Sequence, residues 1–155
     1  MYDQQLILKS PQVEQDWQDY YDLRWRILRA PWQQPRGSEQ DEYEGSAYHV
    51  MATDPQQRIL AVGRIHQLDD QTAQIRYMAT VESARGRGIG ALVLNALEQQ
   101  AHHWGVRHLF LNARSQAATF YQRNGYRVIT QGETLFGEIP HWRMEKILSL
   151  DSSTN

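Results

Sequence analysis

The apolar residues of this 155-residue chain change their spacing along the sequence, and the changes predict where strands and helices alternate. Short runs that alternate apolar with polar residues, or that are rich in β-branched and aromatic residues, are typical of strands. Such runs predict seven strands, at Gln4–Lys9, Ala47–Thr53, Ile59–Leu68, Ile75–Val81, His108–Ala113, Arg127–Gln131 and Ile139–Leu148.

Apolar residues three or four positions apart predict helices between these strands. The first helix is expected to start at Ser10-Pro11, because serine caps a helix and proline suits its first position. It must end before Pro31. Two more helices are expected at Ile89–Trp104, ending at the left-handed cap Gly105, and at Gln116–Asn124, closed by Gly125.

The order of these elements predicts an α/β fold, in which a mixed sheet carries helices on both faces. A chain of this length is one domain's worth and can bury a real core. We therefore expect a single domain over residues 1–148 and a frayed tail over residues 149–155.

Composition excludes several classes of protein. A formal net charge of -2 argues against nucleic acid as an obligate partner, since phosphate-backbone binding requires a basic excess. The chain has no cysteine, which removes disulfides, thiolate metal sites and a cysteine nucleophile. No histidines and acids have a recognisable metal-ligand spacing, so no metal is expected. Without a leader-like start or a membrane-length apolar run, we expect a soluble, cytoplasmic protein that is not bound to a membrane.

The most informative segment joins the fourth predicted strand to the second helix, and it reads Arg85-Gly86-Arg87-Gly88-Ile89-Gly90. Glycines at such a turn let the backbone approach a ligand closely. The free N–H groups at the start of the helix then favour a phosphate. The sequence therefore predicts that these six residues hold a phosphorylated cofactor.

Two nucleotide interpretations fit this segment less well. Gly86-x-Gly88-x-x-Ala91 satisfies the relaxed dinucleotide fingerprint, which also requires the turn to follow the first strand and an acid about 20 residues further on. Here the turn lies past the middle of the chain, and no Asp or Glu occurs between Glu98 and Glu133. The Gly-Lys-Ser/Thr of a nucleotide-hydrolase loop is absent as well.

Three segments together resemble one family, the GCN5-related N-acetyltransferases. Residues Arg85–Gly90 match its pyrophosphate-loop signature, Arg/Gln-x-x-Gly-x-Gly/Ala, at every defined position. Ala117–Tyr126 resembles the A-x-x-F-Y-x-x-x-G-F/Y segment of the family, and Glu138–Met144 resembles the I-P-H-x-x-M ending of an ElaA-like bacterial branch. The segments occur in family order, and the resemblance covers roughly residues 4–148.

The resemblance implies the acyl-CoA N-acyltransferase fold, in which a twisted sheet of about seven strands is splayed between the fourth and fifth. The pantetheine arm of acetyl-CoA, the co-substrate, would lie in that splay against the backbone of Met78, Ala79 and Thr80. Asn112, at the end of the fifth predicted strand, is a further candidate for a polar contact to the cofactor. Arg87 would neutralise a phosphate of CoA, and a solvated loop arginine is the alternative.

The resemblance further implies an N-acetyltransferase that moves the acetyl group of acetyl-CoA directly to a primary amine in a ternary complex. The alternative is a non-catalytic acyl-CoA-binding sensor or interaction module. Tyr121 is the candidate proton donor to the leaving thiolate, against the alternative that it packs with Phe120 as core. His141 has the pKa suited to a general base, Glu138 is the second candidate, and a buried, hydrogen-bonded strand histidine is the alternative for His141.

The remaining candidate residues concern the binding of the acceptor amine or have structural roles. The region Pro31–Ser46 carries Glu39, Asp41, Glu42 and Glu44 beside aromatic residues, and in this fold it commonly lines the acceptor site. A solvated acidic face is the interpretation we favour for it. Arg114 stands where many relatives have asparagine, and its role is left open. The remaining histidines are expected to be structural, and a small-molecule or peptide amine acceptor and a homodimer are compatible with the sequence.

Overall fold

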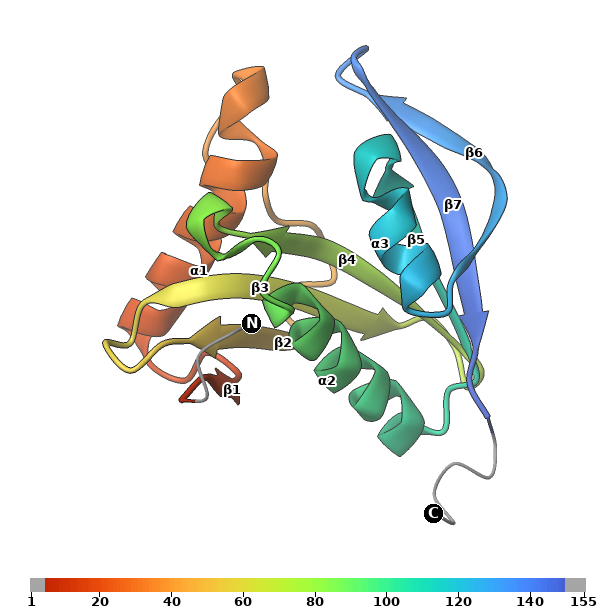
Figure 1. Cartoon of the computed structure of the whole chain (residues 1–155), viewed down its shortest axis with the longest axis horizontal. Coiled ribbons are helices and arrows are strands. Elements are labelled where there is room, and N and C mark those ends of the chain that lie inside the picture. The colour runs from red at the N-terminus through yellow and green to blue at the C-terminus, as the bar shows by residue number, and fades with distance from the viewer. Residues whose placement is uncertain (1–4, 150–155) are drawn as a thin grey trace. The chain divides into compact units, whose positions relative to one another are not determined.

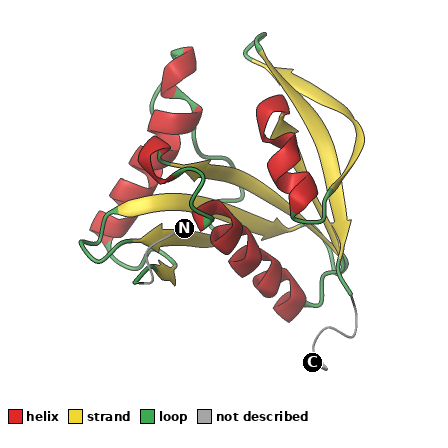
Figure 2. Cartoon of the chain, viewed as in Figure 1, coloured by secondary structure: helices red, strands yellow, loops and turns green. Residues whose placement is uncertain are grey.

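The computed structural model describes residues 5–149, which form one sheet of seven strands with three α-helices (Figures 1 and 2). The strands are β1 (Ile7–Lys9), β2 (Tyr48–Thr53), β3 (Ile59–Gln67), β4 (Thr72–Thr80), β5 (His108–Arg114), β6 (Arg127–Leu135) and β7 (Ile139–Ile147). The α-helices are α1 (Glu14–Leu28), α2 (Ile89–Trp104) and α3 (Ala118–Arg123), and the 3-10 turns are η1 (Ala30–Trp32), η2 (Glu82–Ala84) and η3 (Ser115–Ala117).

The sheet is mixed, with the strand order β1-β2-β3-β4-β5-β7-β6. The β1–β2, β2–β3, β5–β7 and β6–β7 pairs are antiparallel. The β4–β5 pair is parallel and joins Thr72–Gln74 to His108–Phe110. This confirms the predicted α/β class, and the splay of β4 from β5 beyond these residues stays a prediction.

The chain divides into two compact units. The first runs to His66 and resumes over Tyr77–Gln100, and the second comprises Gln67–Arg76 and the chain from Ala101 onward. Both units are built from segments far apart in sequence, as expected where strands and helices interleave. The single domain expected over residues 1–148 stays a prediction.

In the first unit, α1 and α2 cover opposite faces of the sheet. Tyr20 and Leu23 of α1 belong to a buried cluster with Val62 of β3. The next residue, Gly63, faces the other way, and a Cβ built on it would lie 2.9 Å from Cγ1 of Val93 in α2. Because alternate strand residues point to opposite faces, β3 separates the two helices.

The start of α1 differs from the prediction. The helix begins at Glu14, and the carboxylate of Asp16 accepts hydrogen bonds from the backbone N–H groups of Gln12 and Val13. Ser10 does not cap the helix, since its hydroxyl donates to the carbonyl oxygen of His49 at 2.7 Å. The aspartate therefore satisfies donors at the helix start, and the serine ties the preceding segment to β2.

In the second unit, β5, β7 and β6 form an antiparallel ladder, and α3 packs against β5 and β6. The φ angle of Gly105 is +82°, which confirms the predicted left-handed end of α2, and Gly125, which was predicted to close α3, has a φ angle of +94°. The predicted C-terminal tail, apart from Ser149, lies outside the described residues.

Candidate functional site

The glycine-rich segment forms a tight turn between η2 and α2. Gly86 and Gly88 have φ angles of +77° and +81°, a conformation that glycine adopts at little cost and other residues rarely adopt. Ile89 follows as the first residue of α2, and its side chain is buried. The buried side chain of Ile89 thus anchors the turn. Because its two left-handed residues are glycines without side chains, a ligand can approach the backbone of the turn closely.

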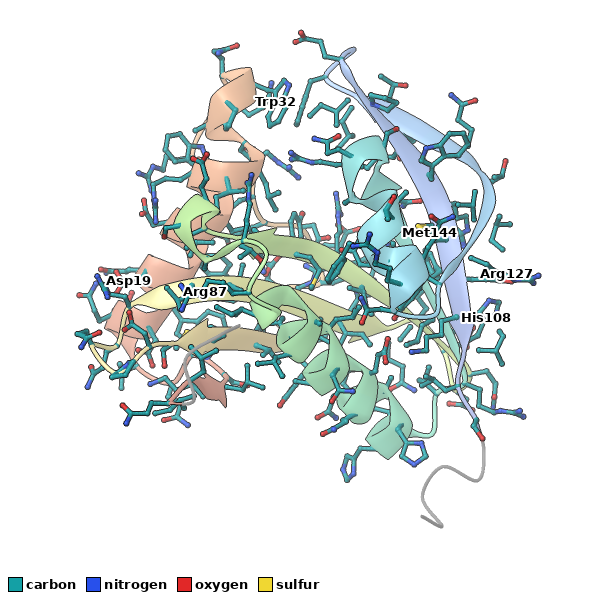
Figure 3. All side chains as sticks on the ribbon, viewed as in Figure 1. Asp19, Trp32, Arg87, His108, Arg127 and Met144 are labelled. Atoms are coloured by element: carbon teal, nitrogen blue, oxygen red, sulfur yellow. The ribbon has the colours of Figure 1, made fainter. Side chains whose placement is uncertain are left out.

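The charges around this turn suit a phosphate group. Arg85 is exposed and Arg87 is half-buried, and Figure 3 shows Arg87 on the loop before α2. The first N–H groups of a helix have no acceptor inside the helix, and the 16-residue α2 adds its dipole at this end. The described residues therefore fit the phosphate-bearing part of a cofactor.

The strand that leads into this turn has an unusual backbone. Tyr77, inside β4, has a φ angle of +61°, which costs a bulky residue about 1–2 kcal/mol. The next residues, Met78 and Thr80, are half-buried, and Ala79 between them is buried. These three residues and the glycine turn belong to the same unit, so the predicted pantetheine strand and phosphate loop are parts of one compact body.

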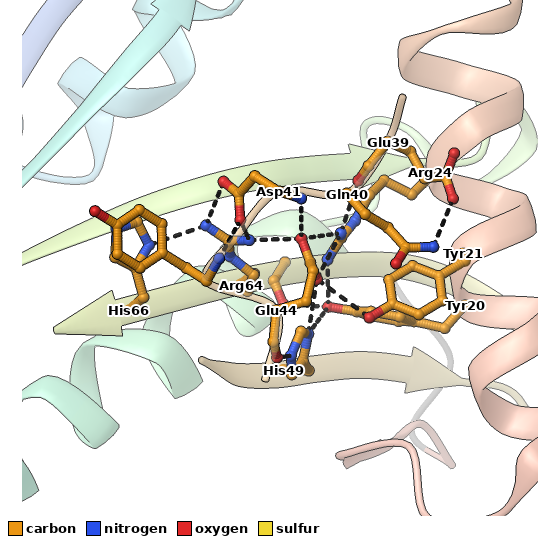
Figure 4. Close-up of polar contacts among 12 residues, drawn as sticks. Tyr20, Tyr21, Arg24, Glu39, Gln40, Asp41, Glu44, His49, Arg64 and His66 are labelled. Carbon is orange, nitrogen blue, oxygen red and sulfur yellow. Dashed lines mark hydrogen bonds and ion pairs between the residues drawn. The ribbon is translucent and has the colours of Figure 1, made fainter. Parts of the chain in front are cut away.

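A buried ionic network lies beside this strand in the first unit (Figure 4). Arg24 of α1 and Arg64 of β3 have fully buried side chains. Nη1 of Arg24 donates to both carboxylate oxygens of Glu44 at 3.0 Å. Nη1 of Arg64 donates to Oε2 of Glu44 and to Oδ1 of Asp41, both at 2.6 Å. Two buried cations are thus neutralised by two carboxylates from one loop.

These ion pairs fix the charge of Arg64. Burial acts to lower the pKa of this guanidinium, and the carboxylates of Asp41 and Glu44 raise it above its usual value. Nη2 of Arg64 also donates to Nδ1 of His66 at 2.9 Å. Because guanidinium is only a donor, a neutral His66 carries its proton on Nε2.

The network continues to β2 through Tyr20 and His49. Nε2 of His49 lies 2.9 Å from the carbonyl oxygen of Glu44, which can only accept, so the proton of the neutral ring is on Nε2. The hydroxyl of Tyr20 then donates to Nδ1 at 2.9 Å. Burial lowers the pKa of His49 and raises that of Tyr20 to about 12. Both groups are therefore neutral near pH 7, as a structural role requires.

The solvated acidic face favoured for residues 31–46 is wrong for most of its acids. The side chains of Asp41 and Glu44 are only 11% and 12% exposed, and Glu39 is buried. Glu42 alone of these four acids is exposed. Asp41 and Glu44 turn inward because the cations they neutralise, Arg24 and Arg64, come from α1 and β3.

Tyr121 lies in an aromatic cluster of the second unit. Its ring makes edge contacts with Phe120 at 5.0 Å and Tyr126 at 5.8 Å between centroids. Burial raises the pKa of Tyr121, so the hydroxyl keeps its proton at working pH. Packing of the ring and donation by the hydroxyl are compatible with this position, and the catalytic role stays a prediction.

His141 is buried in β7. Its Nδ1 lies 2.9 Å from the carbonyl oxygen of Ile139, which can only accept, so this hydrogen bond forms when Nδ1 carries the ring proton. Burial lowers the pKa of His141, the carbonyl groups of Ile139 and Glu133 oppose this, and the charge of Arg114 adds to it. Arg114 is the register partner of His141 in the β5–β7 ladder. The imidazole is therefore neutral at pH 7, the state that a general base requires.

The other predicted site residues of the second unit are more exposed. Asn112 is exposed on β5, and its Oδ1 lies 3.5 Å from a Cβ built on Gly132. Glu138 is exposed between β6 and β7. Residues 5–149 contain no group of three or more histidine and acidic side chains arranged to hold a metal ion. Within the same range, every helix is too short or too polar to span a bilayer.

Sequence reasoning missed three residues of this region, Arg24, Arg64 and Tyr77. Two of them left a signal: Arg24 follows Tyr20 by four positions on the apolar face of α1, and Arg64 lies inside an apolar strand. A charged residue at such a position is buried only with a partner. The left-handed backbone of Tyr77 has no sequence signal.

Comparison with known proteins identifies relatives of this chain. The sequence pattern of the Acetyltransferase (GNAT) family matches residues 17–126. The uncharacterized N-acetyltransferase YjcF of Bacillus subtilis (strain 168) is 31% identical over 133 residues, which cover 86% of this chain and 94% of YjcF. Protein ElaA of Escherichia coli (strain K12) is 29% identical over 109 residues, or 68% of this chain and 70% of ElaA.

Solved structures share the fold. The crystal structure of Escherichia coli ElaA matches with a TM-score of 0.72 at 20% identity, covering 91% of this chain and 97% of that one. A GNAT family acetyltransferase from Elizabethkingia anophelis with acetyl-CoA bound matches with a TM-score of 0.71 at 16% identity, covering 96% of this chain and 100% of that one.

Proposed function

We propose that this chain, which belongs to the acetyltransferase (GNAT) family, transfers the acetyl group of acetyl-CoA directly to a primary amine within a ternary complex. The family match and the likeness to ElaA confirm the family and the fold that the three motifs predicted. The observation that carries the proposal is the pair of left-handed glycines, Gly86 and Gly88, at the start of α2.

Donor binding is assigned to the glycine turn and to β4. The backbone N–H groups at the start of α2 and the charges of Arg85 and Arg87 would hold the pyrophosphate of acetyl-CoA. Backbone groups of Met78–Thr80 would bond to the pantetheine arm, and one N–H there would stabilise the developing oxyanion. The bound thioester supplies the activated acetyl group.

Proton transfer is assigned to the side chains that the sequence predicted for it. A lysine-like amine with a pKa of ~10.4 is ~3.4 units from its reactive form at pH 7, or about 4.6 kcal/mol. His141 would accept the proton of the amine, directly or through water, with Glu138 contributing to acceptor binding. As the amine nitrogen bonds to the acetyl carbon and the C–S bond breaks, Tyr121 would protonate the leaving thiolate.

An acceptor panel tests this proposal. Release of CoA from acetyl-CoA is followed with a polyamine, an amino sugar, a peptide amine and a protein lysine as acceptors. The proposal predicts acceptor-dependent release with at least one amine class. Binding of acetyl-CoA without release in the presence of any acceptor would favour the non-catalytic acyl-CoA-binding module instead.

A further inference from the structure

Tyrosine does not prefer a left-handed backbone, so contacts with surrounding residues must stabilise this conformation at Tyr77. A bulky residue in this conformation inside a strand is an outlier that persists only where contacts force it. Tyr77 is 6% exposed as a whole residue, and it belongs to a buried cluster with residues of α1. The residues that follow it are Met78–Thr80, whose backbone is assigned to the acyl donor.

Three guanidinium groups surround the ring of Tyr77. The Cζ atom of Arg24 lies 4.2 Å from the ring centroid, that of Arg64 lies 5.0 Å away, and that of Arg29 lies 5.6 Å away. All three distances are within the range of cation–π attraction. The arginines come from α1, from β3 and from the C-terminal cap of α1, so the ring is fixed from separate elements.

Two of these arginines are in turn fixed by the loop before β2. Glu44 binds both Arg24 and Arg64, and Asp41 binds Arg64 through two oxygens. A continuous series of contacts therefore runs from the loop acids through the arginines to the ring of Tyr77. The ring belongs to the residue of β4 whose backbone is left-handed.

We propose that Arg24 and Arg64 are positioning residues for the acyl donor: by holding the ring of Tyr77, they fix the left-handed turn of β4 and the direction of the Met78–Thr80 backbone. The inference rests on the proposed function in its assignment of that backbone to acetyl-CoA. It also couples the loop over residues 39–44 to the donor strand, so a disturbance of Asp41 is transmitted to β4.

A matched pair of variants, Tyr77→Asn and Tyr77→Leu, separates positioning from packing. Both remove the ring and leave side chains of similar size, but asparagine tolerates the left-handed conformation and leucine does not. Titration calorimetry with acetyl-CoA should show Kd weakened about tenfold or more by leucine and less by asparagine. Tyr77→Phe, which keeps the ring, should bind acetyl-CoA like the original chain. If Tyr77 only fills a buried apolar site, the order of the two Kd values should be reversed, because leucine suits such a site better than asparagine.

The outcomes distinguish this inference from the function on which it rests. If the unmodified protein does not bind acetyl-CoA, the proposed function fails and the inference fails with it. If the unmodified protein binds but Tyr77→Leu binds as tightly as Tyr77→Asn or more tightly, only the inference is overturned.

A second measurement leaves Tyr77 itself in place and applies even if its variants do not fold. Amide hydrogen exchange over residues 77–80 should be faster in Asp41→Asn than in the unmodified protein, because Arg64 loses an anionic partner. The exposed acid of the same loop provides the control, and Glu42→Gln should leave this exchange unchanged. Acceleration confined to the loop, with β4 unaffected by Asp41→Asn, would overturn the coupling.

Discussion

Arg64 and Asp41 form a two-point ion pair, in which Nη1 donates to Oδ1 at 2.6 Å and Nη2 donates to Oδ2 at 3.1 Å. The pair joins a buried strand to a loop 23 residues earlier in the sequence. Planar guanidinium suits this geometry, and lysine would not reproduce it. The loop is thereby held by charge as well as by its own turns.

Asp41→Asn should lower the free energy of unfolding by about 1–3 kcal/mol, because it leaves a fully buried cation with fewer anionic partners. Urea unfolding at pH 7 measures the change. Glu42→Gln removes an exposed acid from the same loop and should cost no more than about 0.5 kcal/mol. Equal effects of the two substitutions would show that Asp41 is not a structural anion.

Gly63→Ala should destabilise the protein by about 1–3 kcal/mol through overpacking. A Cβ at this position would lie 2.5 Å from Sδ of Met78, 2.9 Å from Cγ1 of Val93 and 3.0 Å from Cδ1 of Leu97. Gly45→Ala is the matched control, since a Cβ added there would meet no atom within 4 Å and the φ of Gly45 is not left-handed. A thermal melt in which both variants match the original chain would contradict the close packing of α2 on β3.

Tyr121→Phe should lower kcat by about 100-fold while preserving the thermal shift caused by acetyl-CoA, because it removes a proton donor and little packing. Tyr126→Phe, in the same aromatic cluster, should leave kcat nearly unchanged. Steady-state assays at saturating substrates measure both. Unchanged turnover in Tyr121→Phe would leave this residue with a packing role alone.

His141 should define the acidic limb of the profile of kcat/KM against pH. Since burial lowers its pKa, the free base persists to lower pH than in an ordinary histidine, and the limb should have its midpoint below ~6.5. His141→Ala should slow the reaction and flatten this limb, whereas Glu138→Gln should mainly raise KM for the acceptor. The opposite pattern would transfer the role of base to Glu138.

Local sequence signals predicted most of the architecture. Gly105 and Gly125 marked helix ends because glycine adopts the left-handed conformation at a lower cost than other residues do. The apolar stripe of α2 and the alternation of β4 had periods that only one element type satisfies. The start of α1 was misplaced because Asp16 competed with Ser10, and the better cap lies inside the helix.

The buried ionic network could not be predicted in the same way. Glu44 and its partners Arg24 and Arg64 are each 20 residues apart in sequence, so only the tertiary fold brings their charges together. The sequence of an acidic loop predicts exposed carboxylates, because it does not show which cations the fold places beneath the loop. The glycine turn was predictable because its chemistry lies within six consecutive residues, whereas the left-handed backbone of Tyr77 depends on arginines from other elements.

The most direct test of the account is the thermal shift that acetyl-CoA produces, because a ligand that binds only the folded state stabilises it by about 2.7 kcal/mol at 100 times its Kd. Acetyl-CoA should raise Tm more than NAD or ATP. Gly88→Val should abolish the shift, while Gly105→Val, which places the same side chain at a similar φ at the far end of α2, should retain it. A larger shift with NAD or ATP, or a shift that survives in Gly88→Val, would contradict an acetyl-CoA site at this turn.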